Sequence, residues 1–425
     1  MLQVNEIREN FERACQGLAK RNVPNPETLL RQVLDLDDKR KQTQVERDSL
    51  QAESNALAKQ IGQLMKSGKK EEAEGLKEQT AAKKSQVKAL EEQYSSCENS
   101  LTQLLYSIPN IPHESVPAGK SAEDNEVVLE NGQIPELNPA HKFPHWDLIK
   151  KYDIVDFELG VKITGAGFPV YKGKGAKLQR ALVNFFLDEA EKAGYHEVQP
   201  PIMINEESGY ATGQLPDKEG QMYLAAEDGL YLIPTAEVPI TNMYRNEVLA
   251  EADLPKKNAG FTPCFRREAG NWGAHVRGLN RLHQFDKVEI VQITHPEQSY
   301  PTLEEMSLHV QQLLQKLELP YRVLRLCGGD MGFTSALTYD MEVFSAAQER
   351  WLEVSSVSNF ETYQSNRLKL RFKNHDRKTV LAHTLNGSAL ALPRIVAALL
   401  ENNQSEKGIK MPEVLVPYLG FEWIS

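Results

Sequence analysis

FTPCFRREAGNWGAHVRGLNRLHQFDKVE, residues 261–289, predicts two strands joined by a polar loop that contains glycine. The strand ends, 265–268 and 285–289, bring arginines, carboxylates and a phenyl ring to one end of this hairpin. An arginine fork can hold a phosphate through two hydrogen bonds, and a carboxylate can bind an ammonium group. The residues alone leave two interpretations open: a nucleotide site, or a surface hairpin with incidental ion pairs.

The surrounding C-terminal part, residues 141–425, mixes strand-like and helical runs. We expect strands at 198–205, 229–234, 281–294, 321–327, 351–359 and 367–373, and helices at 177–194, 301–319 and 392–403. Strands outnumber helices and cluster in the middle. The pattern therefore predicts an α+β fold, with a large antiparallel β-sheet flanked by helices.

Two long helices are predicted for residues 26–105. Apolar side chains recur every seven residues, as at Leu29, Leu36, Leu50, Leu57 and Leu64 in the first helix and at Leu76, Leu90 and Leu104 in the second. This period is typical of a coiled coil, and Gly68 marks the bend of an antiparallel hairpin. Residues 39–88 carry twelve basic and seven acidic side chains, a net charge of +5. The hairpin arm therefore either contacts a phosphate backbone or carries ordinary solvated charge.

Length and composition exclude several classes of protein. The chain has 425 residues, of which 40% are hydrophobic and 25% charged, and its formal net charge is −10. This is an ordinary globular composition, long enough for two domains. Residues 106–140 are rich in proline, serine and charge and predict a linker, so we expect an N-terminal domain over 1–105 and a second domain over 141–425.

Cysteine usage and hydropathy indicate the compartment. None of the four cysteines forms a CxxC pair, which argues against a zinc ribbon, and we expect no zinc. The N-terminus has no apolar segment like that of a secretory signal, and no apolar run of about 18 residues could span a membrane. We therefore expect a reducing, cytoplasmic setting and no membrane partner.

Familiar nucleotide and metal motifs do not occur in the sequence. Five residues separate Gly167 from Gly173, where a Walker A loop has four, and no GxGxxG follows a predicted strand. His141 and His145 are four residues apart, but Pro144 between them argues against a helical metal pair. A nucleotide would have to be bound by another scheme.

That scheme is suggested by a family resemblance. Residues 261–289 are similar to motif 2 of class II aminoacyl-tRNA synthetases, GYHEVQPP (194–201) to motif 1, and TLNGSALALPR (384–394) to motif 3. ATGQLP (211–216), LIPTAEVPITN (232–242) and WLEVSSVSN (351–359) resemble segments of the bacterial-type seryl-tRNA synthetases. With the coiled-coil arm, the resemblance covers nearly the whole chain. It implies a class II catalytic domain over 141–425, a tRNA-binding domain over 1–105, and a homodimer held through motif 1.

The resemblance implies a bent ATP at the motif 2 hairpin. Arg266 would bind the α-phosphate and stabilise charge as the carboxylate of serine attacks, Glu268 would contact the adenine end, and Phe285 would stack on the adenine. Arg394 would lie on the other side and reach the γ-phosphate, while Glu353 and Ser356 would hold the Mg²⁺ that bridges the phosphates. The implied ATP set is Arg266, Arg267, Glu268, Phe285, Glu353, Val354, Ser355, Ser356 and Arg394, with Arg266 and Arg394 as catalytic residues.

The same resemblance implies a pocket for L-serine. Glu237 and Glu289 would receive the ammonium group, and Ser388 would meet the hydroxyl. The implied set is Thr235, Ala236, Glu237, Arg266, Glu289, Thr384, Asn386 and Ser388. A pocket that hydrogen-bonds a substrate hydroxyl penalises alanine, because its own buried polar groups are left unpaired.

The implied reaction has two steps, formation of seryl-adenylate and transfer of serine to the 3′ end of tRNA(Ser). The arm would hold the long variable arm of that tRNA by shape and backbone, and tRNA(Sec) would be a second acceptor where the organism has one. Two other hypotheses remain: a related enzyme that loads a carrier protein, which we expect to lack the arm, and a coiled-coil RNA-binding scaffold with a decayed ATP site.

The sequence departs from the family pattern at a few positions. Ala389 and Pro393 replace motif 3 glycines, Leu337 replaces a common lysine, and NWGAHV (271–276) departs from the usual motif 2 loop.

Overall fold

The computed structural model describes residues 1–217, 219–268 and 277–425, which form two compact units. One unit comprises Met1–Ala19 and Val23–Pro109, and the other comprises Lys20–Asn22 and Asn110–Ser425. The atypical loop NWGAHV, with Trp272, lies outside the described residues.

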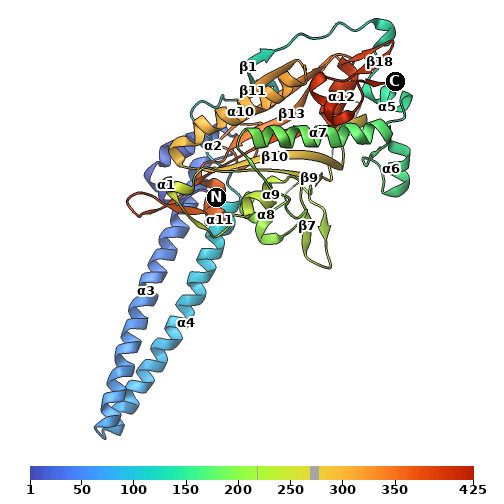
Figure 1. Ribbon diagram of the computed structural model, residues 1–425. Helices are drawn as coiled ribbons and strands as arrows, with labels where there is room; N and C mark the ends of the chain where they lie inside the picture. Colours follow the sequence, from blue (N-terminus) through green and yellow to red (C-terminus); the bar gives the residue numbers. More distant parts are fainter. Residues whose placement is uncertain (218, 269–276) are drawn as a thin grey trace. The chain divides into compact units, whose positions relative to one another are not determined.

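The N-terminal unit is a helical hairpin preceded by two short helices. After α1 (Val4–Glu9) and α2 (Phe11–Lys20), α3 (Pro26–Lys66) and α4 (Lys70–Tyr106) run antiparallel to each other (Figure 1). Pro26 opens α3, where its missing N–H costs no helical hydrogen bond. Gly68 lies in the turn with a φ of +78°, a conformation that suits glycine. The predicted bend is confirmed.

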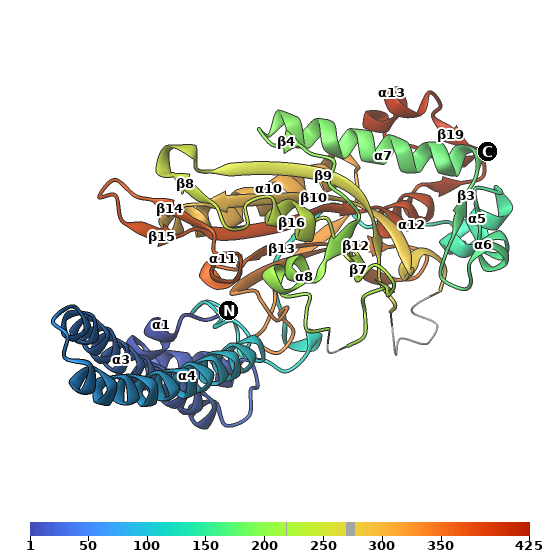
Figure 2. The ribbon, with the colours of Figure 1, turned by 90° about the horizontal axis from the view of Figure 1, so that it is seen from below.

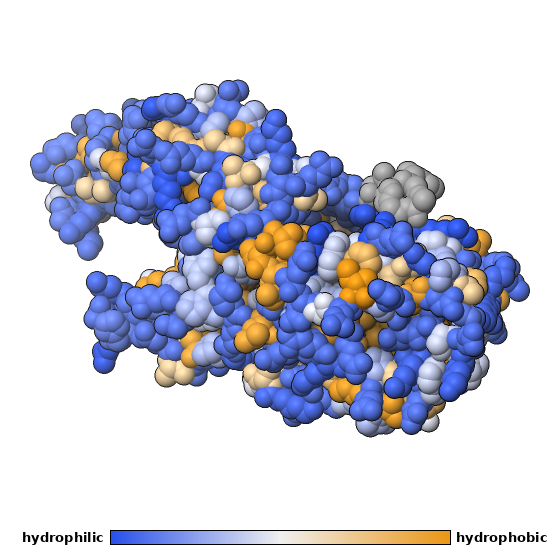
Figure 3. All heavy atoms as spheres, turned by 90° about the horizontal axis from the view of Figure 1, so that it is seen from above, coloured by the Kyte–Doolittle hydropathy of each residue, from blue (hydrophilic) through white to orange (hydrophobic). Residues whose placement is uncertain are grey.

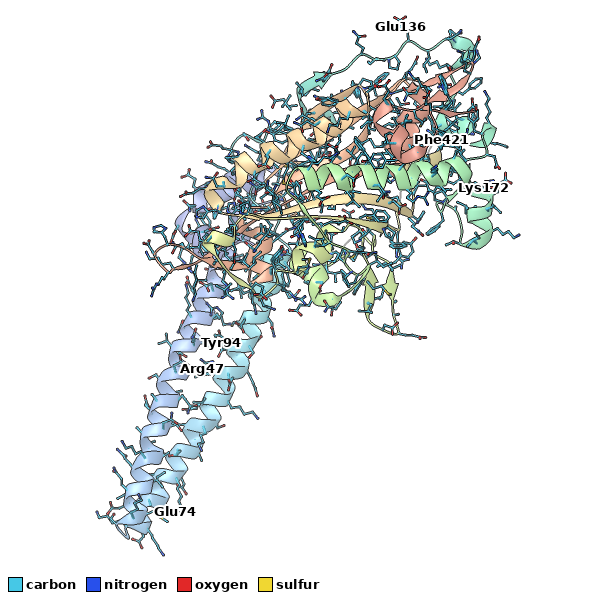
Figure 4. All side chains as sticks on the ribbon, in the orientation of Figure 1. Arg47, Glu74, Tyr94, Glu136, Lys172 and Phe421 are labelled. Atoms are coloured by element: carbon cyan, nitrogen blue, oxygen red, sulfur yellow. The ribbon has the colours of Figure 1, made fainter. Side chains whose placement is uncertain are left out.

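The seam between α3 and α4 follows the predicted heptads. The leucines that the heptad period places in the seam, from Leu29 to Leu64 in α3 and from Leu76 to Leu104 in α4, are all partly buried. The ring of Tyr94 on α4 lies 5.9 Å from the Arg40 guanidinium carbon and 5.1 Å from that of Arg47, both on α3 (Figure 4). Lys83 on α4 pairs with Glu53 on α3 at 2.5 Å. These polar contacts occur at one register only, so they specify the alignment of the two helices.

An eight-stranded sheet forms the centre of the second unit. Its order is β1 (Glu126–Asn131), β11 (Tyr321–Arg325), β12 (Leu337–Ser345), β13 (Arg350–Asn359), β16 (His383–Ala391), β10 (Gln284–Thr294), β9 (Lys256–Phe265) and β4 (His196–Glu197). All neighbouring strands are antiparallel except β9 and β4. The predicted α+β fold with a large antiparallel sheet is confirmed.

Helices cover the two faces of the sheet unequally. Val288 and Ile290 of β10 pack in the main core with α7 (Gly173–Lys192), α10 (Ser299–Lys316) and α12 (Leu392–Asn402). Val291 and Ile293 point the opposite way, toward the smaller helices α8 (Glu206–Thr212), α9 (Glu237–Asn242) and α11 (Thr362–Leu368). Figure 2 shows α7 on one side of the sheet and α8 and α11 on the other. The helices on this second face are shorter than those that cover the main core.

Small sheets and helices complete the unit. They are α5 (His145–Lys151), β2 (Val155–Asp156), α6 (Phe157–Ile163), β3 (Val170–Tyr171), β5 (Met203–Asn205), β6 (Leu224–Ala225), β7 (Leu230–Leu232), β8 (Val248–Ala250), β14 (Arg371–Lys373), β15 (Thr379–Leu381), β17 (Gln404–Ser405), β18 (Gly408–Lys410), α13 (Val416–Leu419) and β19 (Trp423–Ile424).

Several elements differ from the sequence expectation. The segment read as a linker contains β1, which pairs with β11 at the edge of the sheet. The run 367–373 is the end of α11 followed by β14, not one strand, and 198–205 forms a strand only at β5 because Pro200 and Pro201 carry no N–H for a ladder. The sequence does not predict β16 as a strand, because its small and polar residues show no apolar alternation.

The surface carries mostly hydrophilic side chains on the face shown in Figure 3, with apolar residues in separate small groups. No helix among the described residues combines the length and apolar character needed to cross a membrane.

Two residues that depart from the family pattern have ordinary structural places. Pro393 lies in the first turn of α12, as its position in the sequence predicts, and Leu337 is buried in the main core.

Candidate active site

The floor of the site is the face of the sheet that the long helices leave uncovered. Residues of one strand alternate between the two faces, so Glu289 points away from the core that holds Val288 and Ile290. Strand register places Ser388 of β16 directly opposite Glu289. The hairpin of β9 and β10 thus contributes Glu289 to the face of the sheet that carries the site.

Two buried carboxylates meet on this floor. Asn386 donates from Nδ2 to Glu237 Oε2 at 2.9 Å and to Glu289 Oε1 at 3.1 Å. Glu237 is 6% exposed and Glu289 is fully buried. Thr235 donates to Glu289 Oε2 at 3.0 Å, while its hydroxyl accepts from the backbone N–H of Glu237 at 3.2 Å. The fold therefore brings together Thr235, Glu237, Glu289 and Asn386, four residues from three separate segments.

Electrostatics make this pocket receptive to a cation. Burial raises the pKa of Glu237 from 4.5 to about 7, and the charge of Glu289 adds to the rise. A hydrogen bond from Gln364 and the charges of Lys287 and Arg266 oppose the shift. An ammonium group placed beside these carboxylates would favour the ionised form of Glu237.

Two pocket residues were missed in the sequence. Lys287 pairs with Glu289 Oε2 at 2.5 Å and donates to Thr235 Oγ1 at 3.0 Å, so it compensates one of the two buried charges. Gln364 of α11 donates to Glu237 Oε1 at 2.6 Å and accepts from Thr384 Oγ1 at 2.7 Å. Lys287 shares its strand face with Phe285 and Glu289, a two-residue spacing that could have identified it. Nothing local in the sequence marks Gln364.

The remaining residues of the serine set occupy different places. Ser388 is 7% exposed and lies on the pocket side of β16, opposite Glu289. Ala236 is fully buried in the small core with Ile240 and Val291. Ala236 is therefore a packing residue beneath the pocket.

Arg266 and Phe285 lie together at the end of the hairpin. The guanidinium carbon of Arg266 is 5.3 Å from the centre of the Phe285 ring, and its Nε donates to the carbonyl of Pro234 at 3.3 Å. Glu268 is held by an ion pair with Arg281. Arg267 points elsewhere: it donates to the carbonyl of Met222 at 3.0 Å and stacks over Tyr223.

A second arginine reaches the site from α12. Arg394 Nη1 donates to the carbonyl of Glu353 at 2.6 Å and lies 3.6 Å from its carboxylate, while Nε donates to the carbonyl of Asn280 at 3.0 Å. The guanidinium is thus oriented by two backbone carbonyls.

A β-bulge arranges the residues between Glu353 and Ser356. Glu353 pairs with Glu342 and Ser355 with Met341, so Val354 is an extra residue in β13. Residues three apart in a regular strand face opposite sides, and the bulge returns Glu353 and Ser356 to the same side. Val354 is buried in the main core, and Ser355 donates to the carbonyl of Ser388 at 2.6 Å. Val354 and Ser355 therefore support the site through packing and backbone contacts.

The chain is similar to known proteins over nearly its whole length. Residues 223–403 match the tRNA synthetase class II core domain (G, H, P, S and T), and residues 1–112 match the seryl-tRNA synthetase N-terminal domain. The chain is 49% identical to the serine–tRNA ligase of Salinibacter ruber, over 99% of this chain and 98% of that protein. It is 46% identical to the enzyme of the same name from Methylacidiphilum infernorum, over the full length of both.

Solved structures give the same result. The seryl-tRNA synthetase of Pyrococcus horikoshii, crystallised with ATP, superposes with a TM-score of 0.91 at 33% identity, over 100% of this chain and 99% of that one. The cytoplasmic serine–tRNA ligase of Naegleria fowleri, in complex with AMP, gives a TM-score of 0.87 at 27% identity with the same coverage.

Proposed function

Because the chain belongs to the seryl-tRNA synthetase family and is an ATP-dependent serine–tRNA ligase, we propose the following division of that reaction among its residues. In the first step, a carboxylate oxygen of L-serine attacks the α-phosphorus of ATP, and the bond to pyrophosphate breaks. In the second step, a hydroxyl of the terminal tRNA ribose attacks the seryl carbonyl, and AMP leaves. The protein binds and orients the reactants and forms no covalent intermediate.

The amino-acid pocket carries this proposal. Glu237 and Glu289, joined by Asn386, bind the ammonium group of serine, which supplies the positive charge that their site lacks. Ser388 and Thr384 border the same pocket and bind the substrate hydroxyl. Loss of that hydroxyl leaves polar groups unpaired, so alanine binds more weakly.

The two arginines act on the phosphates. Arg266 binds the α-phosphate and the attacking carboxylate, where its charge stabilises the crowded oxygens of the transition state. Phe285 stacks on the adenine, Glu268 contacts the adenine end, and Arg394 binds the γ-phosphate from the opposite side. Arg267 holds the 221–223 segment through its side chain and its backbone N–H, and we assign it no contact with the phosphates.

Mg²⁺ fits the oxygen donors at the bulge. Glu353 and Ser356 share one face of β13, and Asp340 lies directly opposite Ser356, with a buried Oδ1 that has no hydrogen-bond partner among the described residues. Carboxylate and hydroxyl oxygens suit this cation, which takes its other ligands from phosphates and water. When bound, Mg²⁺ neutralises charge on the phosphate oxygens. No group of three or more histidine, cysteine or acidic side chains suited to a metal occurs in the described part of the chain.

The arm is proposed as the tRNA-binding element. Six exposed lysines have no ion-pair partner among the described residues: Lys39, Lys59, Lys66, Lys70, Lys84 and Lys88. Unpaired ammonium groups can displace counterions from a phosphate backbone. We assign residues 1–105 to tRNA(Ser) binding, 106–140 to a connecting segment and 141–425 to catalysis, in the cytoplasm where tRNA is charged.

A homodimer through the motif 1 region is also proposed. A groove of about 420 Å³ lies along α7 beside 197–199 and is bordered by Arg180, Asn184, Leu187 and Asp286. Burial raises the pKa of Asp286 to about 6, so a cation from a second copy would stabilise its charge. Arg180→Glu should weaken the dimer in sedimentation velocity, whereas Lys407→Glu, an exposed residue on a separate element, should not. Equal sedimentation of both variants and the parent protein would exclude this surface.

The experiment that tests the function is exchange of labelled pyrophosphate into ATP, with each of the twenty amino acids in turn and no tRNA. Serine alone should support exchange. Exchange with another amino acid would overturn the pocket assignment, and no exchange at all would leave an RNA-binding scaffold as the function. Charging of separated tRNA(Ser) and tRNA(Sec) transcripts then identifies the acceptors.

A further inference from the structure

A largely buried network outside the catalytic pocket links α5, α12 and the turn at residues 278–280. His145 donates from its backbone N–H to Glu401 Oε1 at 2.8 Å, and its ring Nδ1 lies 2.6 Å from the same oxygen. Gln348 Nε2 donates to that oxygen at 2.9 Å, and Ser345 donates its hydroxyl to the other oxygen of Glu401. Both His145 and Glu401 have no exposed surface.

The contacts of the imidazole determine its tautomer. The backbone N–H of Leu279 donates to His145 Nε2 at 2.8 Å, so Nε2 carries no proton. The proton is then on Nδ1, directed at Glu401. A neutral imidazole with one donor and one acceptor is held here in a single orientation by a carboxylate on one side and a peptide group on the other.

The turn is pressed closely against this ring. Gly278 has a φ of +67°, and a Cβ built on it would lie 2.3 Å from His145 Nε2. Only glycine fits at that distance and in that conformation. The position of the turn is therefore set by the ring of His145.

The next residue of the turn contacts a residue of the ATP site. The backbone carbonyl of Asn280 accepts the Nε–H of Arg394 at 3.0 Å. The side-chain amide of Asn280 donates to Gln348 Oε1 at 3.0 Å. Arg394 and Glu401 are seven residues apart on α12, which is two turns, so both face the same side of the helix. One end of α12 thus holds the network, and the other end carries the arginine that the network orients.

We propose that His145 is a positioning residue for ATP. Its Nε2 holds the Leu279 N–H, which places the Asn280 carbonyl where it orients the guanidinium of Arg394. The inference rests on the proposed role of Arg394 at the γ-phosphate. It assigns to His145 no contact with substrate, so its effect should appear in ATP binding and not in serine binding.

The test uses two substitutions that separate the functions of the ring. In His145→Asn the short amide still reaches Glu401 but leaves Leu279 without an acceptor. In His145→Gln the longer amide places an oxygen near the Leu279 N–H. Measured by pyrophosphate exchange, His145→Asn should raise the KM for ATP about tenfold, the usual order for one lost buried hydrogen bond, with the KM for serine unchanged. His145→Gln should restore most of the ATP affinity.

Controls separate this idea from loss of stability and from failure of the proposed function. His309→Asn removes another buried histidine, from α10 on the long-helix side of the sheet, and should leave the KM for ATP unchanged. If Arg394→Ala does not affect the KM for ATP, the role of Arg394 is wrong. If Arg394→Ala raises it but His145→Asn does not, the inference about His145 is wrong. Should His145→Asn fail to fold, Gly278→Ala displaces the same turn and must raise the KM for ATP.

Discussion

Glu237 and Glu289 share one amide: Asn386 Nδ2 lies 2.9 Å from the first carboxylate and 3.1 Å from the second. The two carboxylates belong to α9 and β10, and Lys287 lies 2.5 Å from Glu289, whereas Glu237 forms no ion pair with the residues that the structure describes. The site therefore has two acids and only one base in direct contact with them. In the proposed mode of binding, the α-ammonium of serine supplies the second positive charge.

Serine affinity should therefore depend on pH. Because the pKa of Glu237 is raised to about 7, the ionised fraction falls from about one half at pH 7 to about one tenth at pH 6. The KM for serine in pyrophosphate exchange should rise about fivefold over that interval, while the KM for ATP changes little. A KM for serine that is constant from pH 8 to pH 6 would contradict the proposed role of Glu237.

The stability of the free protein should show the opposite pH preference. Between pH 4.5 and about 7 the folded protein keeps a proton on Glu237 that the unfolded chain has released. The free energy of unfolding should thus fall as pH rises through this window, by about 3 kcal/mol from this residue. Urea denaturation from pH 5 to pH 8 measures the slope, and Glu237→Gln should reduce it. An unchanged slope in Glu237→Gln would mean that Glu237 titrates normally.

Removal of the pocket hydroxyl should weaken amino-acid discrimination. Ser388→Ala deletes a polar group on the pocket side of β16, opposite Glu289. We expect serine activation to fall and the preference for serine over alanine to drop by about tenfold or more, since an unpaired buried polar group costs about 1–3 kcal/mol. The ratio of kcat/KM for the two amino acids is the measurement. Ser307→Ala on α10 is a matched control, a buried serine that packs on the long-helix side of the sheet.

Loss of Arg266 should abolish adenylate formation and spare the fold. Within the described part of the chain, its guanidinium makes one hydrogen bond, to a backbone carbonyl, and lies over Phe285, so few of these contacts depend on it. Arg266→Ala should lower the exchange rate by about 10²-fold or more, as expected for a lost electrostatic contact in the transition state. Thermal unfolding within a few degrees of the parent would show that the fold is intact. Near-normal exchange would refute the role of Arg266.

Shortening the arm should separate the two steps. The Glu53–Lys83 pair shows which residues face each other, so replacing 48–88 with a short glycine-rich turn removes matched lengths of α3 and α4. Serine-dependent exchange should be retained and tRNA charging lost, because the deletion removes five of the six unpaired lysines. Alanine substitution of those five lysines in the full-length arm distinguishes charge from shape. Retained charging in the shortened protein would exclude the arm from tRNA binding.

Features with a local period could be read directly from the chain. The heptads of α3 and α4, the bend at Gly68, the helices α7, α10 and α12, and the β9–β10 hairpin all follow from side chains that repeat at 3.5, 3.6 or 2 residues. Each repeat reflects burial of one face of one element, which depends mainly on neighbouring residues. The strand β16 escaped this reasoning because its pocket face carries Thr384, Asn386 and Ser388 where an ordinary strand would be apolar.

The pocket itself depended on long-range register. Gln364 meets Glu237 across 127 residues, and Leu279 meets His145 across 134. No spacing in the chain marks such pairs, because strand order and helix packing bring them together only after the sheet has formed. The bulge at Val354 is a further case, since it turns Glu353 and Ser356 to one side against the alternation that the sequence predicts. Residue types and local periods were therefore available from the sequence, whereas the partners of each charged group required the assembled fold.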